Sequence, residues 1–229
     1  MNFFLAFLVA GSLSWWMPWD SGTNPGAPAQ DNKENVAFRW GFGALVGKEK
    51  KFVPITRDTT LATGDEIKMV VELKKECFVY LIHHSPNGDV SLLFPEDIRQ
   101  FAGDYNVGKN YYIPKGRGWF ELDSNAGRET FYLLAANERL LELEALIGEH
   151  AAASRDARPD VAKKILAEIR DVKRKFRTFT TLAERPVTIG GNIRGVDEAE
   201  PARRPDVASI ATEISASNFY SKTYTIEHK

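Results

Sequence analysis

His83 and His84 are the residues whose types and spacing first suggest chemistry. Adjacent residues on a strand point to opposite faces, so this pair cannot bind one metal ion together without a bulge in the strand. Ser85, Asp89 and Ser91 follow closely and suggest a serine triad with His83, but no nucleophile elbow or comparable motif accompanies them. We therefore predict no catalytic residue and no metal ligand, and we interpret the histidines as residues at the end of a strand.

Two glycine-containing runs have some resemblance to ligand-binding loops. The run GGNIRG at residues 190–195 lacks the lysine and the following helix that a phosphate-binding P-loop needs. The run NGD at residues 87–89 is too short for a calcium loop. We interpret both runs as turns and predict no cofactor.

Basic and aromatic side chains gather in two further places. Residues 163–177 include seven basic and two acidic residues, which suits either binding to nucleic acid or an anionic membrane, or the solvated face of an amphipathic helix. Aromatic residues near turns at 111–120, among them Phe120, suit either a stacking surface or core packing. The candidate interaction surface comprises Lys163, Lys164, Arg170, Lys173, Arg174, Lys175, Arg177, Tyr111, Tyr112 and Trp119.

The elements that must position these residues are organised around residues 61–95. Apolar and polar residues alternate from Ile67 to Leu73, which predicts a half-buried strand. Residues 77–84 are apolar on both faces, which predicts an interior strand covered on both sides. Asn87-Gly88 suits a hairpin turn, and residues 90–94 then return as a third strand that Pro95 ends.

Further strands are expected on either side of this stretch. Residues 36–46 form one in which Gly41 and Gly43 mark a bulge or a close backbone approach, and Pro54 confines the next to an edge. Residues 129–136 are a second strand with two apolar faces, and residues 219–226 are a final strand that returns to the sheet. Shorter strands are predicted at 52–57, 111–114, 119–123 and 185–196.

Two helices are predicted between the strands at 129–136 and 219–226. Asn137 is a suitable N-cap for the first, which continues to about residue 153. Pro159 opens the second, and Val161, Ile165, Ile169, Val172 and Phe176 form one apolar face along it. That face must pack on the sheet, on the first helix or on a second copy of the chain. The two strands with apolar outer faces favour the sheet.

Composition limits the class of protein. With 229 residues and 43% hydrophobic residues, the chain can form one large or two small domains with a substantial core. The net charge of −1 produces no global field toward nucleic acid or membranes, so no nucleic-acid partner is expected. Cys77, the single cysteine, cannot form an intrachain disulfide and is interpreted as a buried thiol.

The N-terminal residues resemble a targeting segment. Residues 1–19 carry no charged side chain, residues 3–13 match the apolar core of a secretory signal, and residues 27–29 suit a cleavage site, although the usual basic start is missing. An uncleaved membrane anchor and a buried N-terminal segment are the alternatives. A lipid anchor is excluded because Ser12 stands where the lipidated cysteine would be. Residues 20–35 are interpreted as a linker.

A family resemblance rests on the residues of the sheet. The run GDEIKMVVELKKECFVYLIHHSPNGDVSLLFP, followed by YYIP and WFELDSNAGRETFYLLAA, resembles the bacterial domain of unknown function 4384 over about residues 55–136. Its motifs are a Gly-Asp entry, an aromatic strand with a hairpin turn and a Leu-Phe-Pro exit. The resemblance implies an accessory domain of exported or multidomain bacterial proteins, and it brings no catalytic residues.

The predicted fold is mainly β (α+β): an antiparallel β-sandwich-like domain with an inserted two-helix hairpin and a returning C-terminal strand. Residues 1–29 are the signal peptide or anchor, residues 30–35 end the linker, and residues 36–229 form a single domain, with a family-like core (55–136), a helical hairpin (137–176) and C-terminal strands (185–229).

The expected function is a non-catalytic exported binding or scaffolding module of the bacterial cell envelope, with another envelope protein as its partner. The expected location is periplasmic or extracellular, or at the inner membrane through an uncleaved N-terminal segment. The alternatives are a hydrolase-type enzyme with a site built from loops, and a cytoplasmic nucleic-acid-binding protein that uses the basic segment 163–177.

Overall fold

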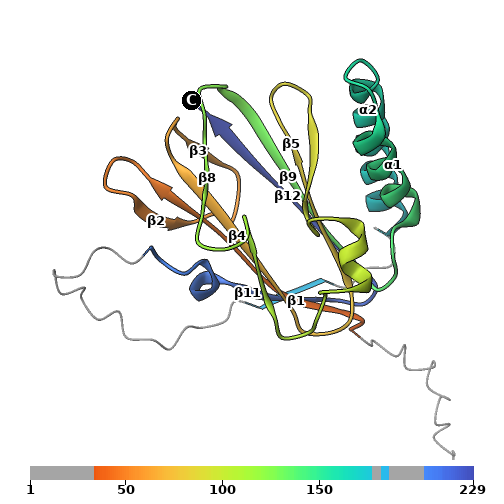
Figure 1. Ribbon diagram of the computed structural model, residues 1–229. Coiled ribbons are helices and arrows are strands. Elements are labelled where there is room, and N and C mark those ends of the chain that lie inside the picture. Colours follow the sequence, from red (N-terminus) through yellow and green to blue (C-terminus); the bar gives the residue numbers. More distant parts are fainter. Residues whose placement is uncertain (1–33, 177–181, 186–203) are drawn as a thin grey trace, which may run out of the picture. The chain divides into compact units, whose positions relative to one another are not determined.

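The computed structural model describes residues 34–176, 182–185 and 204–229 (Figure 1). The chain divides into two units between Asn32 and Lys33, and everything described below belongs to the second unit. The described residues form two β-sheets that pack face to face, and a pair of α-helices covers one sheet (Figure 1). The prediction of a mainly β, sandwich-like fold with an inserted helical hairpin is confirmed.

The first sheet has seven strands within the described residues, and all its pairs are antiparallel. Its order is β10-β11-β1-β4-β7, with β2 also beside β1 and β8 also beside β4. The strands are β1 (Val36–Val46), β2 (Lys51–Pro54), β4 (Glu66–Leu73), β7 (Asn110–Ile113), β8 (Phe120–Glu121), β10 (Leu182–Arg185) and β11 (Thr212–Ala216).

The second sheet has five strands in the order β3-β12-β9-β5-β6. They are β3 (Thr59–Leu61), β12 (Phe219–His228), β9 (Gly127–Ala136), β5 (Phe78–His84) and β6 (Val90–Phe94). Only β3, which runs parallel to β12, departs from the antiparallel pattern in this sheet. The two strands predicted to be interior, β5 and β9, both lie inside the sheet, and the predicted final strand returns as β12 beside β9.

The core lies between the sheets because one face of each strand is apolar. Along β4, Ile67 and Met69 face the second sheet, and they join the same buried cluster as Leu81 of β5 and Leu133 of β9. Lys68, between them in sequence, points to the opposite face of the first sheet. Strand parity therefore decides which side chains reach the interior and which line the outside.

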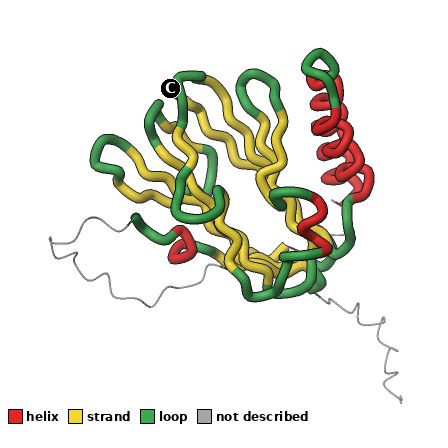
Figure 2. The backbone as a smooth tube through the Cα atoms, in the orientation of Figure 1, coloured by secondary structure: helices red, strands yellow, loops and turns green. Residues whose placement is uncertain are grey.

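The helices are α1 (Leu141–Ala152) and α2 (Arg158–Phe176), and they cover the outer face of the second sheet, as Figure 2 shows in red. The apolar face of α2 is buried at Val161, Ile165, Ile169 and Val172, in one cluster with Tyr80 of β5. The prediction that this face packs on the sheet is confirmed. The two helices follow β9 in the chain, and β10 and β11 of the first sheet come after them, before the chain returns as β12 beside β9.

The predicted start of the first helix at Asn137 is wrong. The Asn137 amide donates to the carbonyl of Asn218 at 3.0 Å, which continues the β9–β12 ladder past the end of β9. The helix begins at Leu141, and its cap residue Leu140 has no capping side chain of its own. Instead the hydroxyl of Tyr80 accepts from the Leu140 amide at 3.0 Å. Tertiary contacts have overridden the local capping preference.

Several smaller predictions are also settled. A Cβ at Gly41 would lie 2.6 Å from the carbonyl oxygen of Val207, so the predicted close backbone approach is confirmed. Cys77 is buried, and burial raises the pKa of its thiol to about 11. The strand predicted at 185–196 lies almost wholly outside the described residues, which include only its first residue. No helix in the described parts is both long and apolar enough to cross a membrane.

Candidate functional site

The open side of the sandwich is bordered by one edge strand from each sheet. β6 pairs only with β5, and β7 pairs only with β4. Within the described residues, no hydrogen bond reaches the outer edge of either strand. Each strand ends at a proline with a cis peptide bond, Pro95 after β6 and Pro114 after β7. Two strand edges with free backbone donors and acceptors therefore border the same side of the molecule.

A groove runs between β6 on one sheet and β7 and β8 on the other. It consists of two neighbouring cavities of about 380 and 370 Å³ that share Leu93 and Phe120 in their walls. Phe120 lies opposite Ile67 in the β4–β8 register, so its ring belongs to the inner face of the first sheet, yet it is 37% exposed. The ring is thus an accessible apolar surface where the two cavities meet. Volumes of this size are typical of ligand pockets.

One end of the groove contains a histidine–carboxylate pair. Nε2 of His83 lies 2.5 Å from Oε2 of Glu129, and the His83 ring stacks on Phe131 with centroids 4.8 Å apart. Both side chains are largely buried, at 23% and 11% exposure. Ser91 of β6 is the direct cross-strand neighbour of His83. Three polar side chains from β6, β5 and β9 thus lie in a row at the mouth of the sandwich.

This end of the groove is acidic. Four residues with carboxylates contribute to its lining (Asp89, Glu121, Asp123 and Glu129), and no lysine or arginine does among the residues described. The backbone amide and side chain of Asn125 donate to the Asp123 carboxylate, and they hold its pKa below the usual range. The acidic end therefore favours a cationic group over an anionic one.

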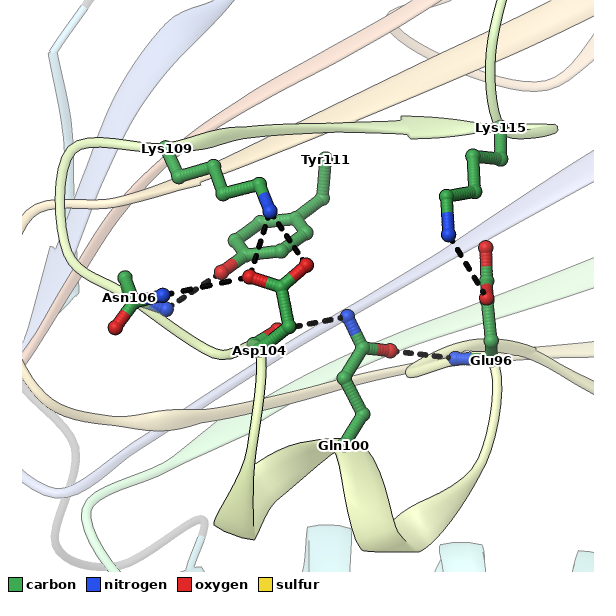
Figure 3. A network of polar contacts seen from close by, with 7 residues as sticks. All are labelled: Glu96, Gln100, Asp104, Asn106, Lys109, Tyr111 and Lys115. Carbon is green, nitrogen blue, oxygen red and sulfur yellow. Dashed lines mark hydrogen bonds and ion pairs between the residues drawn. The ribbon is translucent and has the colours of Figure 1, made fainter.

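The other end is rimmed by two ion pairs that join the loop after β6 to the two ends of β7 (Figure 3). Nζ of Lys109 donates to both carboxylate oxygens of Asp104 at 2.6 and 2.5 Å, and Lys115 lies 3.6 Å from Glu96. All four side chains are at least 46% exposed, so water and salt screen these pairs. The rim can therefore open at little cost.

The three predicted aromatic residues do not share one surface. Tyr111 is buried, its ring packs against Phe94 at 5.4 Å, and its hydroxyl accepts from the amide of Asn106 (Figure 3). Tyr112, the next residue of β7, is half-buried, and it lines both the groove and a second cavity that also includes Trp119. Adjacent strand residues point to opposite faces, so Tyr111 and Trp119 share no cavity although Tyr112 borders both.

The basic residues of α2 are mostly paired with their neighbours. Lys163 binds Asp160, and Lys164 binds Glu149 of α1, each at 3.0 Å. Arg174 binds Asp171, and Nζ of Lys173 bonds to the hydroxyl of Thr223. Arg170 is exposed and Lys175 lies 5.7 Å from the ring centroid of Phe176, whereas Arg177 lies outside the described residues. Much of the positive charge on this helix is therefore neutralised locally.

The polar residues at the acidic end do not form a recognisable catalytic or metal centre. No group of three or more His, Cys, Asp or Glu residues with metal-binding geometry occurs in the described residues. No hydrogen bond joins His83 to Ser85 or Ser91 there, and the Ser85 hydroxyl instead accepts from the Asp89 amide at 3.1 Å. What the arrangement offers is a groove with polar groups at both ends and an apolar wall between them.

Sequence reasoning singled out His83 and Phe120 but missed Glu129 and Leu93. Glu129 is 46 residues from His83, and only the β5–β9 register brings the two together. One signal was present: Glu129 has the same strand parity as Phe131 and Leu133, which face the core. A carboxylate on the inward face of an apolar strand must find a polar partner or a cavity.

The described residues define a mainly β, sandwich-like fold with a helical pair over one sheet. Within it, residues 60–139 match the family model described as Domain of unknown function (DUF4384), which confirms the predicted resemblance. The match includes β4 to β9 and therefore the whole groove, whereas both helices, β11 and β12 lie outside it. No curated protein and no solved structure matches the chain.

Proposed function

We propose that this protein is a non-catalytic binding module whose groove takes up an extended segment of another protein. The observation that carries the proposal is that two unpaired strand edges, β6 and β7, line one groove with an accessible apolar wall at Leu93 and Phe120. An extended peptide can pair with an edge strand through its backbone and place alternate side chains in pockets. Such binding needs no catalytic residue.

The charged residues of the groove indicate which side chains the bound segment should carry. The cavity around His83 and Glu129 has carboxylates and no lysine or arginine among its described lining residues, so a lysine or arginine side chain of the ligand is favoured there. The other cavity has two acidic and two basic side chains that pair with each other across its rim. The proposed ligand is therefore an extended segment with an apolar residue for Phe120 and a basic residue beside it.

The proposed place of action is outside the cytoplasm, with another cell-envelope protein as the partner. Support comes from the uncharged residues 1–19 and the small residues at 27–29. The test is fractionation of the native host together with the intact mass of the recovered protein. An exported protein that begins near Gln30 or Trp15 is expected, or a membrane-bound protein if the segment is retained. A cytoplasmic protein that still begins at Met1 would contradict export.

The binding proposal is tested with random twelve-residue peptides displayed on phage and selected on the purified full chain. The affinities of the selected peptides are then measured by fluorescence anisotropy. We expect binding to weaken at least about tenfold, or 1.4 kcal/mol, in Phe120→Asp and Leu93→Asp. Leu141→Asp is the matched control, because Leu141 is 62% exposed on α1 and away from the groove. Circular dichroism of all three variants checks that they fold.

A second test of strand addition uses chemical changes to the backbone of the peptide. Only every second residue of an added strand donates its amide to the edge of the sheet. N-methylation at one parity should therefore abolish binding, while N-methylation at the other should leave it nearly unchanged. Glu129→Gln and Asp123→Asn should weaken peptides with a basic residue and leave neutral peptides unaffected. Selected peptides that bind Phe120→Asp as tightly as the wild type would refute the proposal.

A hydrolase is the second candidate, because Ser91, His83 and Glu129 are lateral neighbours at one cavity. The hydrogen bond that would activate the serine is not formed in the described structure. A fluorophosphonate probe, which reacts with activated serines, distinguishes the candidates. Labelling that is lost in Ser91→Ala would establish the enzyme, and a chain that stays unlabelled is expected of the binding module.

A further inference from the structure

A separate cavity lies on the outer face of the first sheet. Its volume is about 540 Å³, and the basic and aromatic residues of its lining are Lys68, Tyr112, Arg117, Trp119 and Arg204. Lys68 alternates with the core residues Ile67 and Met69 along β4, so this cavity opens on the side away from the sandwich core. Segments more than 80 residues apart in sequence meet here, because Asp206 and Val207 also border it.

Two aromatic rings of the cavity are held in place by their neighbours. The Trp119 ring meets Phe52 edge to face, with centroids 6.2 Å apart. Phe52 in turn lies over Gly43, where an added Cβ would approach its ring to within 2.4 Å. The Tyr112 hydroxyl donates to Oδ1 of Asp206 at 3.0 Å. Both rings provide a flat apolar surface, and because they are already held in place, little side-chain conformational entropy is lost when a ligand binds.

The charge of the lining is predominantly positive. Arg204 binds Glu66 at 2.7 Å, but the same carboxylate also binds Lys50 at 2.9 Å, so it does not neutralise both cations. Arg117 is exposed and forms no ion pair within the described residues. Asp206, the acidic residue of the lining, already accepts from Tyr112 and from the amide of Ala208. The positive charges of the two guanidinium groups are therefore not fully neutralised by the nearby carboxylates, which favours binding of an anion.

Lys68 organises the cavity without being available to a ligand. Its residue is only 5% exposed, and its ammonium group donates to the carbonyls of Pro114 and Gly116 at 3.0 and 2.9 Å and also to Gly118. Burial, and then the charge of Arg204, lower the pKa of Lys68. The loop that carries Arg117 is thus attached to the sheet by a buried cation, and the local potential is positive.

We propose that this outer cavity is a binding site for a small planar anion, an aromatic ring that bears a carboxylate group. Tyr112 and Trp119 offer the ring apolar contact, and the guanidinium groups of Arg117 and Arg204 match the geometry of a carboxylate. The groove and this cavity share Tyr112 and Gly116 in their walls, but Arg117, Trp119 and Arg204 line this cavity and not the groove. The proposal therefore rests on side chains that the proposed peptide binding does not use.

The test uses three probes of related structure on the purified full chain: benzoate, benzamide and acetate. Benzamide keeps the ring but lacks the charge, and acetate keeps the charge but lacks the ring. Binding is measured by ligand-observed NMR at fixed ionic strength, and millimolar affinity is expected for so small a ligand. We expect benzoate to bind at least about tenfold more tightly than either of the other probes, since both kinds of contact contribute.

Variants locate the site. Arg117→Gln and Trp119→Leu should each weaken benzoate binding at least about fivefold, as expected for the loss of one of the two kinds of contact. Arg128→Gln is the control, because Arg128 is an exposed arginine on the other sheet, where it forms a cross-strand ion pair with Glu227. If Trp119→Leu does not fold, the exposed Arg117 still provides the test. Equal binding of benzoate and acetate, or unchanged binding in Arg117→Gln, would overturn the proposal.

Discussion

Replacing Tyr80 with phenylalanine removes one hydroxyl group on which the junction of sheet and helices depends. This hydroxyl donates to Oε1 of Glu144 at 2.6 Å and accepts from the Leu140 amide at 3.0 Å. Tyr80 and Glu144 are both buried, at 0% and 7% exposure, so water cannot easily replace the lost partner. The expected result is a less stable protein in which the start of α1 loosens first.

The magnitude follows from the two hydrogen bonds. A buried donor or acceptor left without a partner costs about 1–3 kcal/mol. The Leu140 amide loses its partner completely, whereas Glu144 keeps its bonds to Arg139. The Tyr80→Phe variant should therefore lose about 2–4 kcal/mol of unfolding free energy. The ring itself stays, so its edge contact with Phe101 at 5.2 Å is preserved.

Urea unfolding of the full chain measures this loss, and amide hydrogen exchange locates it. Tyr132→Phe is the matched control, because Tyr132 is half-buried on the outer face of the same sheet and its hydroxyl forms no hydrogen bond within the described residues. We expect this variant to change stability by less than about 0.5 kcal/mol. Faster exchange in Tyr80→Phe should be concentrated between Leu140 and Glu144.

A double-mutant cycle with Glu144→Gln separates the two bonds of Tyr80. If the hydroxyl and the carboxylate interact, the double variant should lose less stability than the sum of the two single changes. The reasoning is refuted if Tyr80→Phe costs no more than Tyr132→Phe. It is equally refuted if exchange rises uniformly along the chain, because the hydroxyl would then have no local role at α1.

Three further predictions concern stability. Ile169→Ala should cost about 2–5 kcal/mol in urea unfolding because it opens a cavity between α2 and the second sheet, whereas Leu141→Ala, at an exposed site, should change little. Gly41→Ala should destabilise the protein by about 1–3 kcal/mol because the added Cβ would meet a backbone carbonyl. Its control is Gly148→Ala in α1, which has open space around it and should stabilise the protein by up to about 1 kcal/mol. Equal effects of the two changes would contradict the structure. Burial raises the pKa of the Cys77 thiol from 9.0 to about 11, so the folded state keeps this proton to higher pH than the unfolded chain. The unfolding free energy should therefore fall as the pH rises from 9 to 11, by about 3 kcal/mol in total, and Cys77→Ala should lack this part of the decline in urea titrations across that range.

Much of the secondary structure was predictable from the sequence because it depends on neighbours in the chain. The alternation from Ile67 to Leu73 predicts β4, and Gly88 sits in the predicted turn with φ of +85°. The apolar face of α2 was recognisable from its spacing, and so was the need for something to cover it. In each case, residues within one turn or one strand decide which face is apolar.

The start of α1 and the shape of the groove could not be predicted in this way. Asn137 is a good N-cap by type, but Asn218 pairs with it in the β9–β12 ladder and thereby prevents the helix from starting there. His83 stands out in the sequence by its type, yet only the register of β5 with β9 brings it to its partner Glu129. These contacts join residues 46 or more positions apart.

The sequence by itself therefore determined where most strands lie along the chain, the amphipathic helix and the family resemblance. The tertiary structure alone decided which strands became edges, which polar groups share a cavity and where the first helix begins. The physical reason is that periodicity and turn preference act over a few residues, whereas sheet register depends on the pairing of distant strands. Binding surfaces such as the groove are products of that register, because they form where pairing stops.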